Sequence, residues 1–180
     1  MKLIPVLSLL LAASLLAGCK KTESTAVSSP SSASSIDHRP PTHAQPKLPT
    51  IKIYLGAEQL DAELAHTAEQ EEIGMMFRTN VTDESAMLFV LSEPIRAPYG
   101  FWMTNCPMSL SAAYIGPDGI IEEIHHLEKN DTNAVLAASD NIQFVLETSD
   151  GWFARHHVGT GTVIRTEKGS LAETFLKNRQ

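Results

Sequence analysis

Two charged residues stand inside stretches that are otherwise strongly apolar. Arg78 directly follows Met75, Met76 and Phe77, and Glu147 ends an apolar run that begins at residue 142. A buried arginine and a buried glutamate are expected to form an ion pair, because each charge is costly to desolvate alone. In the alternative interpretation, the planar guanidinium of Arg78 binds a ligand carboxylate or phosphate. The sequence favours the ion pair and leaves the ligand site open.

Further residues are candidates for ligand contact. Trp102, Trp152 and Tyr99 could line a groove for a sugar or a peptide, although a tryptophan more often lies in a core. Asn105 and Asp118 are polar groups close to apolar motifs or turns. In a second hypothesis, Asp118, Glu147 and a histidine converge as the acid–base set of a hydrolase that acts on envelope glycans or peptides. The candidate ligand-binding residues are Arg78, Trp102, Asn105, Asp118 and Glu147.

The sulfur and imidazole groups do not form a specific metal-binding pattern. Met76, Met87 and Met103 could bind the soft ion Cu(I) with Cys106 or His125. Methionines beside aromatic residues more often fill gaps in a core. The histidine pairs at 125–126 and 156–157 are poor zinc ligands, because adjacent residues on a strand point to opposite faces. We therefore predict no metal, no cofactor and no catalytic residue.

Alternation of apolar and polar residues predicts the elements that would position these groups. Capping boxes at Thr67–Gln70 and Ser170–Glu173 predict short helices over 68–77 and from Leu171. The turn residues at 116–119 predict a hairpin. The expected strands cover 51–55, 60–65, 86–91, 99–103, 110–115, 120–125, 142–147 and 162–166.

The order of these elements predicts the fold class. Strands dominate and do not alternate with long helices, which argues against a parallel sheet. The expected fold is α+β and β-rich, an antiparallel and partly closed barrel with two or three short helices. Residues 51–180 have the size of one domain and carry nineteen acidic residues against nine Lys and Arg, a net charge of −10. This charge excludes general binding to nucleic acid.

The N-terminal region predicts export and membrane attachment. Residues 1–18 have the layout of a secretory signal, and Leu16-Ala17-Gly18-Cys19 resembles the lipobox of bacterial lipoproteins. The resemblance implies an acylated Cys19 anchored in the lipid bilayer, and Lys20 in place of Asp favours the outer membrane of a Gram-negative bacterium. Residues 19–50 are rich in Ser and Pro and predict a disordered tether. Acylation leaves Cys106 without a disulfide partner, and we predict that it is buried.

Five ordered segments of the chain form a specific pattern, and they are Gly74-Met75-Met76-Phe77-Arg78, Ala86-Met87-Leu88-Phe89-Val90, Phe101-Trp102-Met103-Thr104-Asn105, Ile120-Ile121-Glu122-Glu123-Ile124, and Val145-Leu146-Glu147 with Gly151-Trp152-Phe153. In this order and spacing they resemble the DUF192 family, also called UPF0127. The resemblance implies a small β-rich domain and no known reaction. Thr104 stands where related chains usually have Lys, and Ser111 stands where they have Asp, so the carboxylate expected there is absent.

These observations lead to a ranked expectation of function. The first hypothesis is a membrane-anchored envelope lipoprotein that acts as a non-catalytic binding or envelope-interaction module. Its expected partners are the lipid bilayer, reached through Cys19, and an envelope protein or a small-molecule ligand. The alternative is the hydrolase described above.

Overall fold

The alternating residues after Thr50 and the turn at Gly56 produce the first predicted hairpin. In the computed structural model, which describes residues 40–177, β1 (Thr50–Leu55) pairs with β2 (Glu58–Ala65) in antiparallel register. The other elements are α1 (Ala68–Ile73), β3 (Ser85–Ile95), β4 (Gly100–Phe101), β5 (Leu110–Ile115), β6 (Ile121–Leu127), β7 (Val135–Leu136), β8 (Ile142–Ser149), α2 (Trp152–Arg155), β9 (Ile164–Thr166), β10 (Gly169–Ser170) and α3 (Leu171–Phe175).

Eight of the described strands form one mixed sheet. Their order is β10-β9-β1-β2-β3-β8-β5-β6, and β4 and β7 pair separately. Every neighbouring pair in the large sheet is antiparallel except β2 and β3, which run parallel. The expectation of an antiparallel sheet is therefore only partly right. A parallel pair requires a long connection, because the chain must return from the end of one strand to the beginning of the next. The connection from Ala65 to Ser85 contains α1 and is long enough for this.

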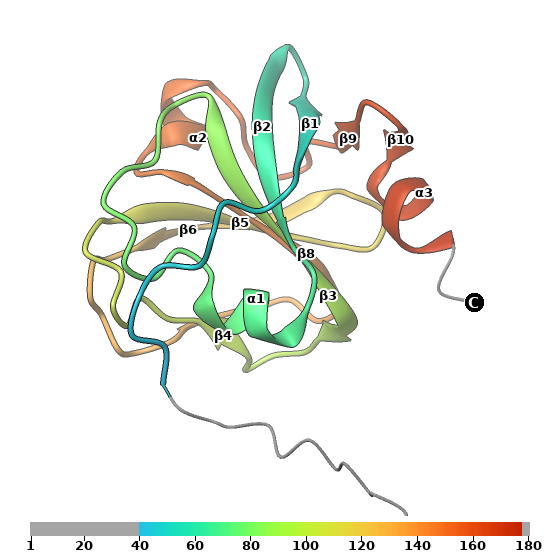
Figure 1. Ribbon diagram of the computed structural model, residues 1–180. Helices are drawn as coiled ribbons and strands as arrows, with labels where there is room; N and C mark the ends of the chain where they lie inside the picture. The colour runs from blue at the N-terminus through green and yellow to red at the C-terminus, as the bar shows by residue number, and fades with distance from the viewer. Residues whose placement is uncertain (1–39, 178–180) are drawn as a thin grey trace, which may run out of the picture. The chain divides into compact units, whose positions relative to one another are not determined.

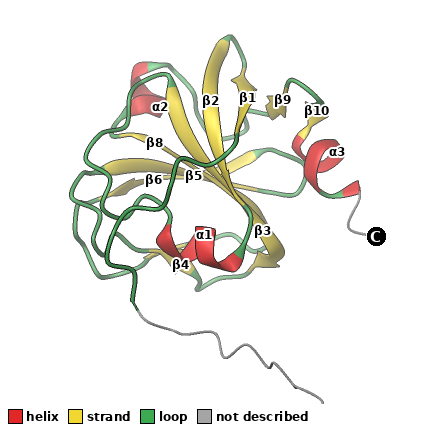
Figure 2. Ribbon diagram, in the orientation of Figure 1, coloured by secondary structure: helices red, strands yellow, loops and turns green. Residues whose placement is uncertain are grey.

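The large sheet curls into a half-barrel, as Figures 1 and 2 show. Its two edge regions meet at one point, where Ile120 and Val163 form an antiparallel bridge. Neighbouring backbone hydrogen bonds join Ile121 to Thr162 and Ile164 to Gly119. The β-rich, partly closed architecture and the three short helices among the described residues agree with the prediction.

Each face of the sheet has its own apolar core. The concave face encloses one cluster, which includes Ile53, Leu88 and Leu146. The opposite face of β3, β5 and β8 carries a second cluster, which includes Met87 and Val145. Side chains alternate between the two faces along a strand, so strands covered on both faces appear buried at almost every position. This explains the continuous burial of β5 and β8.

Connecting segments cover the second core. They are α1 with the residues after it, and the long connection from β3 to β5 that contains β4. Two elements are shorter than predicted. The helix predicted to reach Phe77 ends at Ile73, because Gly74 adopts a φ of 47°. The strand predicted over 99–103 is reduced to the two residues of β4.

The ordered contacts of the domain begin before residue 51. Gln45 donates hydrogen bonds to the backbone oxygens of Gly74 and Gln70, and Leu48 is buried. The signal segment, Cys19 and the part of the predicted tether up to residue 39 lie outside the described residues. Within residues 40–177, no helix has the length and apolar character needed to cross a membrane.

Candidate functional site

A cavity of about 320 Å³ lies between the second core and the segments that cover it. This volume is at the lower end of the range for small-molecule sites. We call it the Glu147 pocket. About half of its lining residues come from four of the motifs that characterise the sequence. The lining residues are Ala68, Glu71, Glu72, Ile73, Gly74, Met75, Met76, Phe89, Leu91, Tyr99, Gly100, Phe101, Trp102, Met103, Thr104, Cys106 and Glu147.

Backbone hydrogen bonds hold two of the lining segments together. The N–H of Phe77, a residue with a φ of 61°, donates to the carbonyl of Asn105 at 2.7 Å. The backbone of Asn105 also adopts the left-handed conformation, with a φ of 58°. Cys106 follows Asn105 in the chain, and its thiol donates a hydrogen bond to the carbonyl of Met75, with Sγ and O 3.7 Å apart. The wall of the pocket is therefore a fixed part of the fold.

Gly74 shapes the wall nearest to α1. Its positive φ ends the helix, and a Cβ at this position would lie 3.2 Å from the ring of Phe89. Only glycine meets both conditions without strain. This requirement explains the Gly at the start of the first motif.

Glu147 is the unusual group in the pocket. It lies in the middle of β8, is 4% exposed and lines the cavity. Its carboxyl group has no hydrogen-bond or ion-pair partner among the described residues. Burial raises the pKa of Glu147 from 4.5 to about 8, because no partner offsets the desolvation of the charged form. At neutral pH most molecules therefore carry a neutral carboxylic acid in the pocket.

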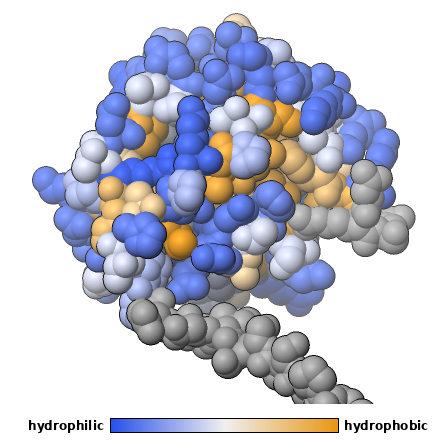
Figure 3. All heavy atoms as spheres, in the orientation of Figure 1, coloured by the Kyte–Doolittle hydropathy of each residue, from blue (hydrophilic) through white to orange (hydrophobic). Residues whose placement is uncertain are grey.

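Aromatic side chains also line the pocket. Tyr99 and Trp102 are 55% and 51% exposed, although both line the cavity. The Phe101 ring lies edge-on to Phe89, with ring centroids 5.0 Å apart. Figure 3 shows that one face of the domain is mainly hydrophilic, with hydrophobic patches between the polar side chains. Of the four large apolar residues that are exposed in the described part of the chain, two belong to this pocket.

The predicted pair between Arg78 and Glu147 is wrong. Arg78 instead forms a two-point ion pair with Glu63, with Nη1 to Oε1 at 2.6 Å and Nη2 to Oε2 at 2.8 Å. The backbone N–H of Leu48 donates to the same carboxylate at 2.7 Å. Burial opposes ionisation of Glu63, but these hydrogen bonds outweigh it and hold the pKa below its ordinary value. Arg78 does not line the pocket and is already engaged.

Two other predicted site residues lie outside the pocket. Asn105 exposes its side chain and contributes to the site through its backbone. Asp118 is exposed in the turn between β5 and β6, where Oδ1 accepts a hydrogen bond from the N–H of Ile120 at 3.1 Å. The lining residues include neither Asp118 nor a histidine, so the acid–base set of the hydrolase hypothesis is not assembled there. Trp102 and Glu147 are the two candidates that the pocket does bring together.

Other potentially reactive groups have structural roles. Cys106 is buried as predicted, and burial raises the pKa of its thiol to about 11, so a nucleophilic thiolate is scarce at neutral pH. Ser111, at the position where the family resemblance implies Asp, accepts a hydrogen bond from the N–H of Gly151 at 2.9 Å. Among the described residues, no group of three or more His, Cys, Asp or Glu side chains is arranged to hold a metal ion.

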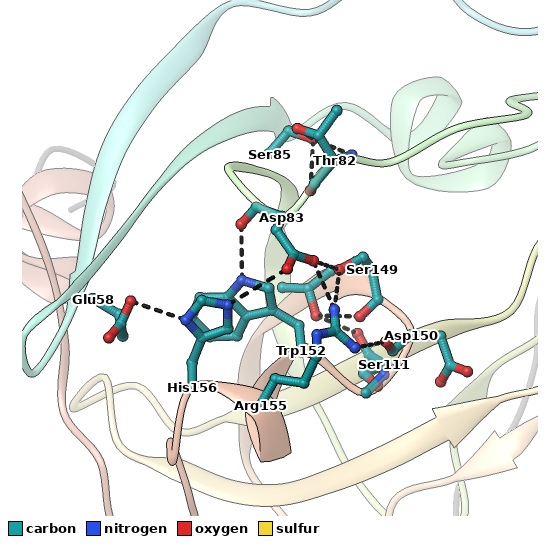
Figure 4. Close-up of polar contacts among 12 residues, drawn as sticks. Glu58, Thr82, Asp83, Ser85, Ser111, Ser149, Asp150, Trp152, Arg155 and His156 are labelled. Carbon is teal, nitrogen blue, oxygen red and sulfur yellow. Dashed lines mark hydrogen bonds and ion pairs between the residues drawn. The ribbon is translucent and has the colours of Figure 1, made fainter.

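A second polar cluster joins α2 to the strand ends around it (Figure 4). Asp83 Oδ1 accepts hydrogen bonds from Ser149 Oγ and Arg155 Nη2, both at 2.6 Å. The ring of His156 lies 3.0 Å from Glu58 Oε2 and stacks on Trp152. The carboxylates and bases of this cluster are paired with one another, which indicates that the cluster fastens the domain. Sequence reasoning missed this cluster because its members are far apart in the chain.

Sequence reasoning also missed most of the pocket wall. Met76, Met103 and Cys106 were predicted to be core residues, which they are, but the same side chains border a cavity. The available signal was the motifs themselves, since segments 74–76 and 101–104 supply much of the lining. Local patterns do not indicate that these segments line one cavity together with Glu147.

Comparison with known proteins identifies solved structures that are similar to this chain in fold and sequence. No curated protein matches the chain. A crystal structure of a proposed transcription regulator from Sinorhizobium meliloti 1021 is 26% identical, with a TM-score of 0.62, over 68% of this chain and 98% of that one. A protein of unknown function from Novosphingobium aromaticivorans DSM 12444 is 27% identical, with a TM-score of 0.61, over 72% of this chain and 94% of that one.

The family comparison covers more than half of the chain. The DUF192 family model, described as "Uncharacterized ACR", matches residues 51–166. This range includes both residues of the Arg78–Glu63 ion pair and the whole lining of the Glu147 pocket. The chain belongs to the DUF192 family.

Proposed function

We propose that this protein is a non-catalytic, ligand-binding lipoprotein of the bacterial cell envelope, and that its ligand occupies the Glu147 pocket. The observation that carries the proposal is a buried carboxyl group without a partner on the wall of a 320 Å³ cavity. A buried polar group normally has a partner, because an unsatisfied group costs free energy. A ligand that satisfies Glu147 recovers that cost.

The lining supports binding more than catalysis. The thiol of Cys106 is protonated at neutral pH, and no histidine lines the pocket to act as a base. An apolar and aromatic wall with one buried polar group is the usual design of a small-molecule binding site.

Thermal unfolding in the presence of ligands tests the binding function. A chain of residues 20–180 keeps every contact described above and omits the segment expected to be removed or acylated. A compound that binds the folded state raises the midpoint by a concentration-dependent amount. The panel contains small apolar compounds with one polar group, saccharides and muropeptides.

A pair of matched variants makes the thermal test specific. Thr104→Trp fills the pocket from a lining position, and Thr160→Trp makes the same change at an exposed loop residue. The proposal expects stabilisation by at least one compound in the parent and in Thr160→Trp, with loss in Thr104→Trp. Stabilisation that survives Thr104→Trp places the ligand elsewhere and refutes the proposal.

The membrane anchor has an independent test. The proposal places the acyl chains on Cys19 and the protein at the outer membrane, on the basis of the lipobox resemblance and Lys20. Cells that express the full chain are labelled with radioactive palmitate. Cys19→Ser should abolish labelling and release the protein from the membrane fraction, whereas Cys106→Ser should retain both. Labelling that persists in Cys19→Ser contradicts the anchor.

A further inference from the structure

We propose that the ligand of the Glu147 pocket is an organic cation, an ammonium group carried on an apolar or aromatic body. This inference rests on the binding function proposed above and names the chemical class of its ligand. The Asp, Glu, Lys, Arg and His positions of the pocket lining are all glutamates, namely Glu71, Glu72 and Glu147. No Lys, Arg or His is present in that lining. An anionic ligand would therefore find no countercharge.

The lining matches the body of such a ligand as well as its charge. Tyr99, Phe101 and Trp102 present aromatic surface at the wall, and Met75 and Leu91 add apolar surface. Aromatic faces attract cations through their quadrupole, and tryptophan does so most strongly. The acidic charge of the domain, −10 over residues 51–180, also attracts cations during encounter.

The same face of the sheet shows what a cation does for a buried glutamate. Glu63, Met87 and Glu147 are direct neighbours in one row across β2, β3 and β8. Residues paired in this way point to the same side of a sheet. Glu63 receives the guanidinium of Arg78 and its pKa falls, whereas Glu147 faces the cavity and its pKa rises. An ammonium ion in the cavity would give Glu147 the kind of partner that Arg78 gives Glu63.

Binding of a cation should release the proton of Glu147. In the free protein this carboxyl group holds its proton below a pH of about 8. The cation pairs with the ionised form, so its affinity should rise about tenfold per pH unit below 8 and level off above it. The other titratable groups around Glu147 are Glu71 and Glu72 from α1, Tyr99 and Cys106 from the connection after β3, and Tyr114 from β5.

Burial separates two of these groups from the predicted transition. It raises the pKa of Cys106 to about 11 and the pKa of Tyr114 to about 12, so both stay protonated between pH 6 and 8.5. The glutamine variant of Glu147 then identifies which carboxyl group causes the pH dependence.

Three ligands with the same ring and different charge test the inference by isothermal titration calorimetry. They are 2-phenylethylammonium, 2-phenylethanol and phenylacetate, each titrated into residues 20–180 at several pH values from 6 to 8.5. We expect the cation to bind at least tenfold more tightly than the alcohol at pH 8.5, with one proton released at lower pH. Phenylacetate should not bind measurably. Tighter binding of phenylacetate than of the cation overturns the inference.

Two substitutions connect the charge preference to the pocket. Glu147→Gln should abolish the pH dependence and weaken cation binding at least tenfold at pH 8.5, while changing binding of the alcohol by less than about twofold. Thr104→Lys places an ammonium group on a lining residue and should exclude the external cation. Thr160→Lys, at an exposed loop residue, is its matched control. Equal cation affinity in the parent and both pocket variants overturns the inference.

The outcomes separate the class of ligand from the existence of a site. If the alcohol binds and Thr104→Trp blocks it, but the cation binds no better and shows no pH dependence, the binding pocket stands and the cation inference fails. If none of the ring compounds binds and the broader panel gives no stabilisation that Thr104→Trp abolishes, the binding function fails and the cation inference fails with it.

Discussion

Two buried glutamates in one row of the sheet have opposite surroundings. Glu63 on β2 accepts two hydrogen bonds from Arg78 and one from the backbone of Leu48. Glu147 on β8, one strand beyond β3, has no partner among the described residues and borders a cavity. Both lie at positions where an apolar side chain would pack. Comparison of the two glutamates shows that burial alone does not distinguish a structural acid from a candidate functional one. The presence or absence of a countercharge does.

This difference in partners distinguishes the surroundings of Glu63, which are structural, from the Glu147 pocket, which is the candidate functional site. The ion pair of Glu63 ties the segment before β1 and the segment after α1 to the sheet. Both carboxylate oxygens of Glu63 are used in these structural contacts. The cost of burying Glu147 is not offset inside the domain, and unsatisfied groups of this kind concentrate at functional sites. The structure thus places an acid whose burial is not offset on the wall of the pocket.

Removal of the partner of Glu63 should have the largest effect. Arg78→Ala leaves a buried carboxylate unpaired, and we expect a loss of about 3–5 kcal/mol in the free energy of unfolding. Chemical denaturation of residues 20–180 measures this loss. Lys52→Ala, which breaks the exposed pair with Asp61, is the control and should change stability far less. A similarly small loss for Arg78→Ala would contradict a structural role for the pair.

Removal of the unpaired acid should have the opposite sign. Glu147→Leu replaces an unsatisfied buried group with an apolar one, and we expect a gain of about 1–3 kcal/mol at neutral pH. Met87→Leu, at the neighbouring position in the same row, controls for repacking and should cost less than about 1.5 kcal/mol. A destabilised Glu147→Leu protein would show that Glu147 has a stabilising partner.

The two glutamates should also impose opposite pH dependences on stability. The folded-state pKa of Glu147 is raised, so its contribution is fully present below about pH 4.5 and is lost as pH rises towards 8, by about 1.4 kcal/mol per pH unit. The folded-state pKa of Glu63 is lowered, so its contribution is present above its unfolded pKa and is lost as pH falls through the folded value.

Differences between the parent and single variants isolate these two contributions. The advantage of Glu147→Gln over the parent should grow from pH 5 to pH 8 and then stay constant. The disadvantage of Glu63→Gln should shrink only in acid. If both differences have the same pH dependence, the contrast between the two sites does not hold.

The smallest effect belongs to a residue that neither region uses. In Asp118→Asn, the side-chain oxygen can still accept the hydrogen bond from the N–H of Ile120. We expect a change in stability of less than about 0.5 kcal/mol and unchanged ligand binding. A large loss of binding would return Asp118 to the site and favour the hydrolase hypothesis.

Local sequence patterns predicted much of the fold and only part of the site. The hairpin of β1 and β2, the strands β5 and β8 and both capping boxes follow from alternation and from side-chain chemistry within a few residues. The parallel pairing of β2 and β3 depends on the path of the chain through α1, which local patterns do not encode.

The choice of partner for Arg78 shows why the site was harder to predict. Glu63 lies in an alternating strand with other charged residues, where exposure is the normal expectation. Glu147, inside an apolar run, therefore looked like the better buried partner. Only the three-dimensional arrangement brings Leu48 and Arg78 to Glu63 and leaves a cavity beside Glu147.

The most direct test of the account is an NMR titration of the glutamate side-chain carboxyl carbons in residues 20–180, without ligand. Glu147→Gln and Glu63→Gln assign the two resonances. The account predicts that Glu147 titrates with a pKa of about 8 and that Glu63 titrates below its ordinary value of 4.5. Titration of Glu147 near 4.5 would contradict the central claim, because it would mean that this carboxyl group is solvated or paired in the free protein.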